Sequence, residues 1–333
     1  MTIGIIGYGR FGKLWAKMMT RFGAVFVHAR NGEDDGGANI KFVSLAQVVQ
    51  VGILFVVVPI SEFEKICQEI APLVPSGTII VDVCSVKVYP SRVMQAVFSK
   101  DQPLLATHPL FGPDSVIRLG LSGRKIVFCP LHASAEQKKT VRDIFEKLQL
   151  VVIETTPDNH DRQMARSQAL VHVLGRAIAD LELESQEIST PDYESLLRIN
   201  SMVNNDTWQL FYDMQVYNPY TPLMRLTLRQ TLDDIEERIR EAGESKAPDD
   251  GTFFLWRSMI EQLDHEIIRL IHHRLIVGKR VQEYKKMHNL PVTDPDRERE
   301  LERSYGEWIE EAGIDDATAV KDILHTIIRE VKK

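Results

Sequence analysis

The feature that most restricts the fold is a series of short apolar runs in the first part of the chain. Between residue 1 and about residue 155, runs rich in β-branched residues alternate with helical stretches; the runs are TIGIIG, AVFVHA, VGILFVVVP, TIIVDV, LLATHP, KIVFCP and LVVIET. Strands that alternate with helices in this way are typical of a parallel sheet covered by helices on both faces. The sequence therefore predicts a doubly wound α/β domain of the Rossmann type over residues 1–155.

Two helical regions follow this domain. Apolar residues in 156–243 recur with a spacing near 3.6 and without strand-like alternation, which predicts an all-helical second domain. The segment EAGESKAPDDG, residues 241–251, is polar and contains Gly and Pro, as interdomain links do. From residue 252 onward a helical rhythm continues for more than thirty residues, and a helix that long usually packs against a partner. We expect a helical C-terminal domain over 252–333 and a homodimer.

Composition narrows the class of partner. The 333 residues carry a net charge of -7 and the pI is near 5.8, which argues against binding to nucleic acid or to an anionic membrane surface. No basic leader precedes the first apolar run and no stretch reaches eighteen consecutive apolar residues, so we expect a soluble cytoplasmic protein that acts on small molecules. Cys67, Cys84 and Cys129 are widely spaced in apolar surroundings, which favours buried thiols over disulfides or a metal site, and no metal is expected.

The motif GYGRFG lies between the first strand and the first helix. Its first glycine, Gly7, allows a tight turn, Gly9 lets a pyrophosphate approach the backbone, and Gly12 lets the helix pack on the strand. In this position the motif predicts a dinucleotide site rather than a coincidental glycine turn. The expected cofactor-binding residues of the motif are Gly7, Tyr8, Gly9, Arg10, Phe11 and Gly12.

Arg30 follows the second strand, in VHARNGE. Proteins that bind NAD usually carry an acid near this position to hold the ribose hydroxyls, whereas an arginine suits the 2′-phosphate of NADP. We therefore expect Arg30 to bind the cofactor and NADP to be that cofactor, with NAD as the alternative. The simpler interpretation of Arg30 is a solvent-exposed loop residue.

Three further motifs carry candidate catalytic side chains. DVCSVK contains Ser85 and Lys87, and THPLFGPDS contains His108; both follow apolar runs, where open α/β sheets bind ligands at the C-terminal ends of their strands. Taken singly, the first fits a turn and the second a buried structural histidine. The third motif, HDRQMARSQALVHVLGR, adds His160 and His172, twelve residues apart and expected on one face of a helix. The occurrence of all three motifs in this order favours a catalytic site over three unrelated structural features.

Together, GYGRFG, VDVCSVK, THPLFGP and HDRQMARSQALVH resemble the prephenate and arogenate dehydrogenases of tyrosine biosynthesis, over roughly residues 1–240. The segments HAR, DVCSVK and THPLFGPDS are most similar to those of the arogenate type that uses NADP. The resemblance implies an oxidative decarboxylation, in which a hydride passes from the ring carbon that bears the hydroxyl to the nicotinamide while carbon dioxide leaves. It also implies that His108 takes up the developing charge of the hydroxyl, that Ser85 bonds this hydroxyl or orients the nicotinamide, and that His172 binds substrate.

One position departs from the family pattern. The arginine that usually binds the substrate carboxylate aligns with Ser201 in YESLLRINSMVNND, and Arg198, one turn earlier, is the nearest substitute. The choice between prephenate and arogenate therefore stays open. Another NADP-dependent β-hydroxyacid dehydrogenase is the alternative activity for this part of the chain.

The stretch NLPVTDPDRERELE, residues 289–302, crowds acidic and basic side chains after a proline. Asp294 suits the N-cap of a helix and Pro295 its first position, and two acids in the first turn complement the helix dipole. Arg297 and Arg299 do not, because cations are disfavoured at a helix N-terminus. We expect a helix start that also builds an anion-binding site.

The long helix upstream carries cations that suit the same anion. Arg274 and Lys285 are eleven residues apart, close to three turns, so they lie on one face roughly 16 Å apart, within joint reach of a small dianion. Arg257 precedes Arg274 by seventeen residues, or roughly 25 Å along a straight helix. It is either a surface charge or a residue that reaches the site of a neighbouring subunit.

Residues 252–333 resemble the all-helical chorismate mutases, whose intertwined dimers lend an arginine from the first helix to the partner's site; the matching segments are LWRSMIEQLD, HHR, YKK and PVTDPDRERE. The resemblance implies catalysis without a covalent step, by holding one conformer and placing charge where the transition state needs it. The residues implied are Arg257 from the other subunit, Arg274 and Arg297 for the carboxylates, Lys285 for the departing ether oxygen, and Asp294 and Glu298 for the hydroxyl or the ring.

The last helix departs from that family. Its usual polar residue, which helps to bind the ether oxygen, would fall about two residues beyond Lys333, and the preceding contact position holds Val331. We expect weak mutase activity or a site completed by another group. The overall prediction is a bifunctional enzyme that converts chorismate to prephenate and oxidises prephenate to 4-hydroxyphenylpyruvate, with tyrosine as a possible inhibitor. The alternative is an arogenate dehydrogenase whose C-terminal domain only dimerises or regulates it.

Overall fold

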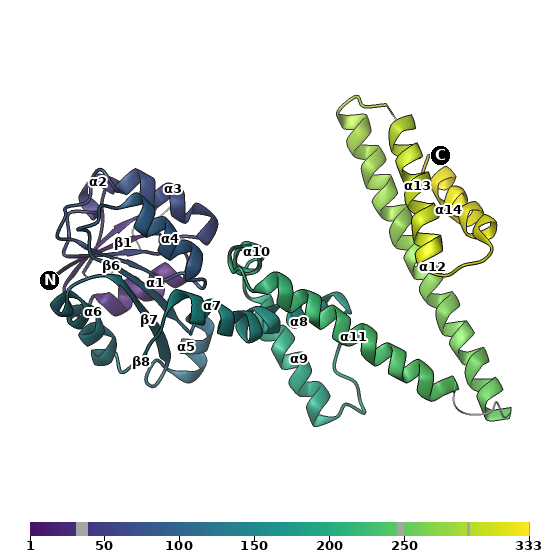
Figure 1. The fold of residues 1–333 in the computed structure, drawn as a ribbon, viewed down its shortest axis with the longest axis horizontal. Coiled ribbons are helices and arrows are strands. Elements are labelled where there is room, and N and C mark those ends of the chain that lie inside the picture. The colour runs from purple at the N-terminus through teal and green to yellow at the C-terminus, as the bar shows by residue number, and fades with distance from the viewer. Residues whose placement is uncertain (31–38, 245–249, 292–293, 333) are drawn as a thin grey trace. The chain divides into compact units, whose positions relative to one another are not determined.

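The computed structural model describes residues 1–30, 39–244, 250–291 and 294–332 (Figure 1). The chain divides into two compact units, Met1–Glu236 and Glu237–Lys333. The first unit contains a sheet and the helices that cover it, followed by further helices, and the second unit is helical.

The described residues of the first unit form an eight-stranded sheet in the order β3-β2-β1-β4-β5-β6-β7-β8. The strands are β1 (Thr2–Ile6), β2 (Ala24–His28), β3 (Ile40–Phe42), β4 (Ile53–Val56), β5 (Ile79–Asp82), β6 (Leu104–Pro109), β7 (Lys125–His132) and β8 (Val151–Glu154). Neighbouring strands are parallel except β6 and β7, because the chain leaves the C-terminal end of β6 and enters β7 at that same end of the sheet. The expected Rossmann-type sheet is confirmed, with an antiparallel pair that the sequence did not indicate.

Helices cover the sheet on both faces (Figure 1), and its central strands β1, β4, β5 and β6 are buried over nearly their whole length, as expected for strands that are mostly apolar on both sides. On one face Trp15 packs against Phe55 and Phe145; on the other, Phe63 and Met94 belong to a second cluster. The first face is covered by α1 (Arg10–Met19), α5 (Pro113–Leu119) and α6 (Ala135–Lys147), and the second by α2 (Leu45–Val48), α3 (Ile60–Ile70) and α4 (Val88–Val97).

Five helices follow the sheet, as the apolar spacing predicted: α7 (Pro157–Arg166), α8 (Gln168–Asp180), α9 (Pro191–Asn204), α10 (Trp208–Tyr217) and α11 (Thr221–Glu244). The expectation that His160 and His172 share one face of a continuous helix is wrong. Ser167 interrupts it with φ -121 and ψ -88, and its hydroxyl donates to the carbonyl of Gln163 at 2.7 Å. A serine bonded back in this way competes with the helical backbone, and α7 ends and α8 begins at this residue.

Hydrogen bonds hold these helices to the sheet part of the first unit. The Asp161 carboxylate accepts the backbone N–H groups of Lys87 and Val88 at 2.7 and 2.8 Å, at the start of α4. The Asp213 carboxylate of α10 accepts from the backbone and the hydroxyl of Ser61 at the start of α3, both at 3.3 Å. Both carboxylates therefore meet helix N-termini, where the helix dipole favours a negative charge.

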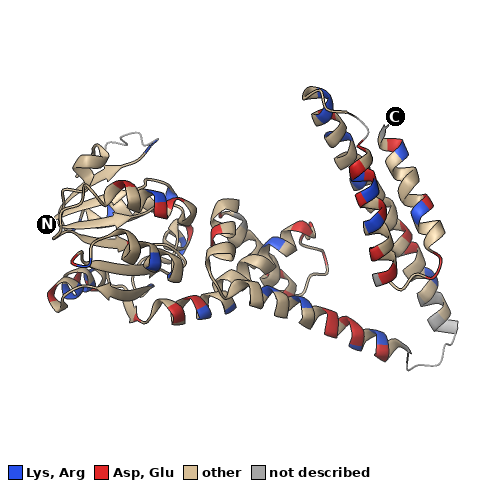
Figure 2. Ribbon diagram, turned by 45° about the horizontal axis from the view of Figure 1, so that its top comes forward, with Lys and Arg blue, Asp and Glu red and all other residues tan. Residues whose placement is uncertain are grey.

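The second unit consists of α12 (Asp250–Met287), α13 (Pro295–Glu311) and α14 (Ala317–Lys332). Asp294 caps α13 by accepting from the backbone N–H of Arg297 at 3.1 Å, and Pro295 takes the first helical position, as predicted. At Gly278 a Cβ atom would lie 2.6 Å from a methyl group of Val331, so α12 and α14 are in close contact there. Acidic and basic side chains line these helices, whereas the strands of the first unit carry few (Figure 2).

No helix in the described ranges is both long and apolar enough to cross a membrane. Cys67, Cys84 and Cys129 are buried and free. Burial raises the pKa of all three thiols, that of Cys129 to about 12, so they are protonated at neutral pH.

Candidate active sites

The glycine loop between β1 and α1 leaves room for a ligand at one of its three glycines. Gly7 has φ +103, and a Cβ there would lie 2.0 Å from the carbonyl oxygen of Val57; a Cβ on Gly12 would lie 2.4 Å from the carbonyl oxygen of Gly7. A Cβ on Gly9 would meet no described atom within 4 Å, and no side chain caps α1. The N-terminal N–H groups of α1 therefore face open space, which fits the pyrophosphate of a dinucleotide.

The other residues of the loop support it or link it to the helices. Tyr8 packs edge-on against Phe42, with ring centroids 4.9 Å apart, and Phe11 stacks on Trp15 at 5.5 Å. Arg10 donates to the Asp114 carboxylate at 2.6 Å and to the backbone carbonyl of Asn205 at 2.9 Å. Arg10 thus joins the glycine loop to the end of α9.

Arg30 lies just after β2 and is exposed, and its guanidinium pairs with the Glu62 carboxylate at 2.5 Å. This pairing raises the pKa of Arg30 and lowers the pKa of Glu62. Both side chains are solvated, so the pair itself stabilises the fold little. An incoming phosphate group would compete with Glu62 for the arginine.

A buried chain of two imidazoles and a carboxylate lies at the end of β6. Nδ1 of His108 is 2.8 Å from Nε2 of His160, and Nδ1 of His160 is 2.7 Å from Oδ1 of Asp161. His108 is 3% exposed, His160 2% and Asp161 0%. The predicted catalytic histidine is therefore held by a second histidine from α7.

The order of partners assigns the protons along this chain. The Asp161 carboxylate already accepts two backbone N–H groups, so it accepts a third hydrogen bond from Nδ1–H of His160. Nε2 of a neutral His160 is then the acceptor, and His108 donates to it through Nδ1–H. This assignment leaves Nε2 of His108 with the lone pair, which is the form a general base needs.

A second buried group lies at the end of β5. Lys87 and Asp82 are both fully buried and form an ion pair, and Asp82 also accepts the backbone N–H of Cys84 at 2.8 Å. Burial raises the pKa of Asp82, and the ammonium group of Lys87 opposes that shift. The hydroxyl of Ser85 is buried in the same turn and has no hydrogen-bond partner among the described residues. The turn that the sequence singled out therefore contains a polar group ready for a ligand.

His172 belongs to a different cluster from His108 and His160. Its Nε2 is 3.7 Å from the Asp206 carboxylate, and its Nδ1 is buried without a partner in the described part of the chain. Burial lowers the pKa of His172, Asp206 opposes the shift and Arg176 adds to it. Because Arg10 of the glycine loop bonds the carbonyl of Asn205, the residue before Asp206, this cluster lies close to the glycine loop.

The expected carboxylate-binding arginine, Arg198, is exposed on α9 and donates to Ser195 of its own helix. Ser201 likewise bonds only along α9 in the contacts observed, to the carbonyl of Arg198 at 2.9 Å. Arg176, one turn after His172, is 8% exposed and its guanidinium lies 4.3 Å over the Trp208 ring. A buried arginine beside a buried histidine is the better-placed cation, and the sequence analysis did not single it out.

The two buried histidines make the folded state sensitive to acid. Burial lowers the pKa of both His108 and His160 below the ordinary value of 6.5, so the unfolded chain binds more protons below that pH. Stability should be fully present above about pH 6.5 and fall as the pH drops, by up to about 1.4 kcal/mol per pH unit for each histidine. Urea unfolding between pH 5 and pH 8 measures this slope. His108→Asn should flatten the dependence, and an unchanged slope would contradict the assignment.

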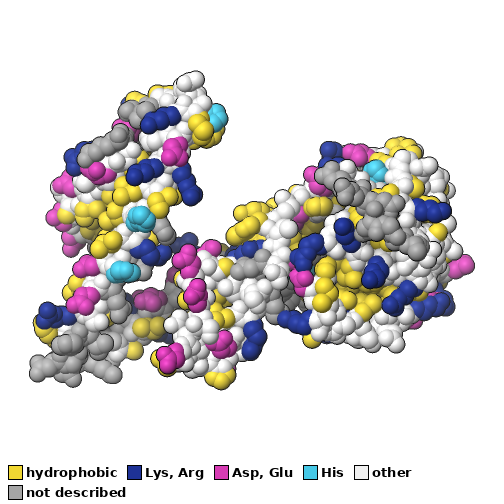
Figure 3. All heavy atoms as spheres, turned by 180° about the vertical axis from the view of Figure 1, so that it is seen from behind, with side chains coloured by type: hydrophobic (Ala, Val, Ile, Leu, Met, Phe, Trp, Pro, Cys, Tyr) yellow, Lys and Arg dark blue, Asp and Glu magenta, His cyan; other side chains and the backbone are white. Residues whose placement is uncertain are grey.

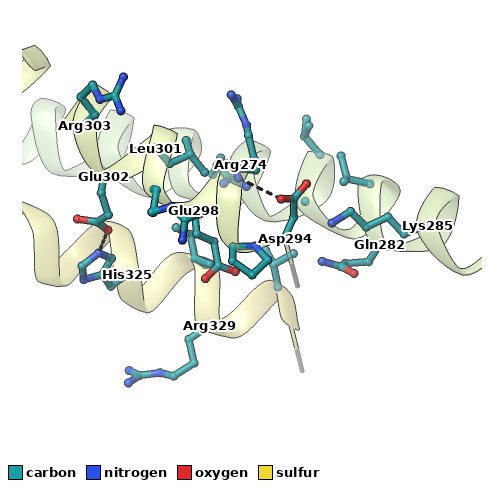
Figure 4. A pocket seen from close by; sticks show the side chains of 18 residues that line it. Arg274, Gln282, Lys285, Asp294, Glu298, Leu301, Glu302, Arg303, His325 and Arg329 are labelled. Carbon is teal, nitrogen blue, oxygen red and sulfur yellow. Dashed lines mark hydrogen bonds and ion pairs between the residues drawn. The ribbon is translucent and has the colours of Figure 1, made fainter. Parts of the chain in front are cut away.

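The second unit contains a cavity of about 1220 Å³ between α12, α13 and α14 (Figure 4). Six predicted residues or contact positions line it, namely Arg274, Lys285, Asp294, Arg297, Glu298 and Val331. Further lining residues include Gln282, Arg299, Glu302, His325 and Arg329. The predicted side chains from α12 and α13 are thus brought together around one cavity with an excess of cations.

Several of these side chains are held by neighbours on the same unit. Arg297 forms an ion pair with Glu300, Arg299 with Asp296, and Glu302 with His325. Arg257, in contrast, is exposed near the start of α12 and is not among the residues that line the cavity. Its predicted role is therefore outside the cavity of its own chain.

Family models match three segments of the chain. Residues 29–154 match the prephenate dehydrogenase nucleotide-binding domain, residues 177–250 a TYRAAT1-like C-terminal domain, and residues 256–333 chorismate mutase type II. These ranges include His108 and the residues that line the cavity of the second unit, whereas the glycine loop and the α7 and α8 residues His160, Asp161, His172 and Arg176 lie outside them.

Curated relatives match the first part of the chain. Arogenate dehydrogenase 1, chloroplastic, from Arabidopsis thaliana is 29% identical over 231 residues, which are 66% of this chain and 36% of the relative. A probable arogenate/prephenate dehydrogenase from Methanocaldococcus jannaschii is 28% identical over 257 residues, 72% of this chain and 57% of the relative. The chain therefore spans between about a third and three fifths of the length of these relatives.

The fold is similar to that of a solved structure, prephenate dehydrogenase from A. aeolicus in complex with hydroxyphenyl propionate and NAD+. The TM-score is 0.60 at 19% identity, and the match covers 79% of this chain and 98% of the other. At this identity the likeness concerns the fold.

Proposed function

We propose that the chain, which joins a prephenate dehydrogenase nucleotide-binding domain to a type II chorismate mutase domain, catalyses two successive steps of tyrosine biosynthesis. The second unit converts chorismate to prephenate, and the first unit oxidises prephenate to 4-hydroxyphenylpyruvate. The observation that carries the proposal is that one chain holds a buried histidine pair at the end of β6, an open glycine loop after the parallel strand β1, and a separate cavity rich in cations.

In the first unit, His108 acts as the base. The chain from Asp161 through His160 holds its Nε2 unprotonated, and burial lowers its pKa, so the imidazole is neutral at pH 7. Nε2 takes the proton of the ring hydroxyl as the carbon beneath it becomes a carbonyl. Loss of carbon dioxide from the opposite ring carbon then returns an electron pair to that oxygen, which takes the proton back as the ring becomes aromatic. The nicotinamide, when bound, supplies the hydride acceptor. Ser85 offers a buried hydroxyl to the same substrate oxygen.

His172 and Arg176 hold the substrate carboxylate. The imidazole has an unpaired buried nitrogen, and the guanidinium is fixed by Trp208 and by the backbone carbonyl of Asp206. An arginine held in this way loses little side-chain entropy on binding, which suits it to recognise a planar anion. Both side chains lie one turn apart on α8, so Arg176 takes the role that the family gives to an arginine at the position of Ser201.

NADP is the proposed cofactor. Arg30 follows the end of β2, the position near which dinucleotide-binding folds usually carry the residue that contacts the adenosine ribose. A 2′-phosphate on that ribose would displace the exposed Glu62 carboxylate and give Arg30 a doubly charged partner instead. NAD offers hydroxyls there and leaves the Arg30–Glu62 pair intact.

In the second unit, cations hold the dianion and stabilise the separating charge. Arg274 and Arg297 bind carboxylates, and Lys285 binds the ether oxygen as its bond breaks. Asp294 and Glu298 face the hydroxyl or the ring from the start of α13. The rearrangement needs no nucleophile, so rate enhancement comes from positioning and electrostatic preorganisation.

A homodimer is proposed as well. Large apolar side chains along α12 are exposed at helical spacing; they include Phe253, Trp256, Met259, Ile260, Leu263 and Ile267. Figure 3 shows apolar surface on this unit. A stripe of this kind is too apolar for a stable monomer surface and suits a second copy of the same helix. Arg257 lies within the stripe, so a partner chain there would carry its arginine toward the other copy's cavity.

A single assay tests the proposal. The full chain receives chorismate and NADP alone, while loss of chorismate and formation of NADPH are followed together. We expect both, because the mutase site makes the prephenate that the dehydrogenase site oxidises. The same assay with NAD, and with arogenate or prephenate added directly, separates the cofactors and the substrates. Oxidation of arogenate or prephenate with chorismate left intact would overturn the mutase half, and turnover of simple hydroxyacids alone would overturn the dehydrogenase half.

A further inference from the structure

The cavity of the second unit contains a neutral side chain that the mutase motif does not include. Gln282 lines the cavity from α12. Its amide oxygen is buried and has no hydrogen-bond partner within the described residues. A buried amide oxygen is normally bonded, so the side chain of Gln282, on the wall of the cavity, has a hydrogen-bonding capacity that its own chain does not use among the described residues.

Helix geometry places Gln282 between the cations that hold the substrate. It lies two turns after Arg274 and one turn before Lys285, about 12 Å and about 4.5 Å along the axis, so the three side chains share a face. Figure 4 shows the side chains of Gln282 and Lys285 next to each other on α12. A group that bonds Lys285 from inside the cavity is therefore within reach of the amide of Gln282.

The surroundings determine what the amide does for the reaction. The contact position on α14 holds Val331, which packs on Gly278 and offers no hydrogen bond to a ligand through its side chain. The same amide carries an NH2 donor beside its oxygen, so Gln282 can donate a hydrogen bond to a ligand in the cavity that it lines. The ether oxygen gains negative charge as the bond breaks, and a donor there lowers the barrier.

We propose that Gln282 is a catalytic residue of the mutase site, donating a hydrogen bond to the ether oxygen of chorismate beside Lys285. The inference rests on the proposed mutase function of the second unit. It names the group that completes a site whose contact position on the last helix is apolar.

The test compares two opposite amide and carboxyl exchanges, one residue apart, in the full chain with chorismate as the probe. In Gln282→Glu the ionised carboxylate cannot donate, so kcat/KM for chorismate should fall by about 10²-fold at pH 8. It should recover as the pH is lowered toward about 5, where a carboxylic acid donates again. Gln282→Leu should lose a similar factor at every pH. Glu283→Gln, at an exposed position outside the cavity lining, should match the parent throughout.

Three outcomes are distinct. An acid-dependent recovery in Gln282→Glu, absent from Gln282→Leu, supports a hydrogen bond to the reacting oxygen, because a merely structural role would not produce it. Rates within twofold of an active parent for both variants would overturn the role of Gln282 alone. A parent that leaves chorismate intact would overturn the mutase function, and the assignment with it.

Discussion

Replacing His108 with asparagine should lower kcat/KM for prephenate oxidation by about 10²–10⁴-fold, the range that a positioned general base contributes. Asparagine approximates the shape of the imidazole but cannot take a proton, and it leaves His160 and Asp161 in place. Initial rates of NADPH formation with added prephenate measure the effect. If arogenate is the substrate, the same loss is expected with arogenate.

The loss should be confined to the oxidation. His108→Asn should convert chorismate at the parent rate, because the mutase cavity is lined by residues of the second unit. His132→Asn provides a matched control: His132 is an exposed histidine at the end of β7 whose ring bonds the carbonyl of Gln102, and its loss should leave both rates unchanged. A rate of oxidation within tenfold of the parent in His108→Asn would rule out His108 as the base.

Replacing Arg274 with alanine should abolish most of the mutase activity, with a fall in kcat/KM of about 10²–10³-fold or more. The guanidinium is proposed to bind a carboxylate of a dianion inside the cavity, and removing one preorganised donor commonly costs this much. With chorismate and NADP as the only substrates, the variant should form almost no NADPH. Added prephenate should restore NADPH formation to the parent rate.

Arg280→Ala is the control for charge on the same helix. Arg280 is exposed on α12 and is not among the residues that line the cavity, so its removal should change neither reaction. If Arg274→Ala still converts chorismate at the parent rate, the cavity is not the mutase site. If both arginine variants lose activity equally, the effect is one of net charge or stability rather than of a specific contact.

Much of the fold, the glycine loop and the start of α13 could be predicted from the sequence, because each depends on local backbone geometry. Gly7 and Gly12 are required by contacts with the backbone within a few ångströms, and Asp294 with Pro295 starts a helix through bonds within one turn. Arg274 and Lys285 could be predicted to lie on one face for the same reason, because eleven residues are close to three helical turns, and both line the cavity.

The rest depended on contacts between distant segments. A serine is acceptable inside a helix, so the break at Ser167 could not be read from residue types, and the hydroxyl bond to Gln163 that accompanies it is a property of the fold. His160 meets His108 across 52 residues of sequence. Arg176 is buried by Trp208 of another helix, although its place one turn after His172 was a signal that it shares that histidine's surroundings.

The bond between Arg10 and the carbonyl of Asn205 closes a loop of 195 residues. A contact of such high sequence separation forms late, because most of the chain must first be synthesised and collapsed before its two ends can meet. The glycine loop is therefore synthesised early, but the carbonyl of Asn205, to which Arg10 donates, is synthesised 195 residues later. The mutase cavity, by contrast, uses residues only from 274 to 331, so the two sites mature by separate routes: one by long-range closure, the other by local assembly of neighbouring helices.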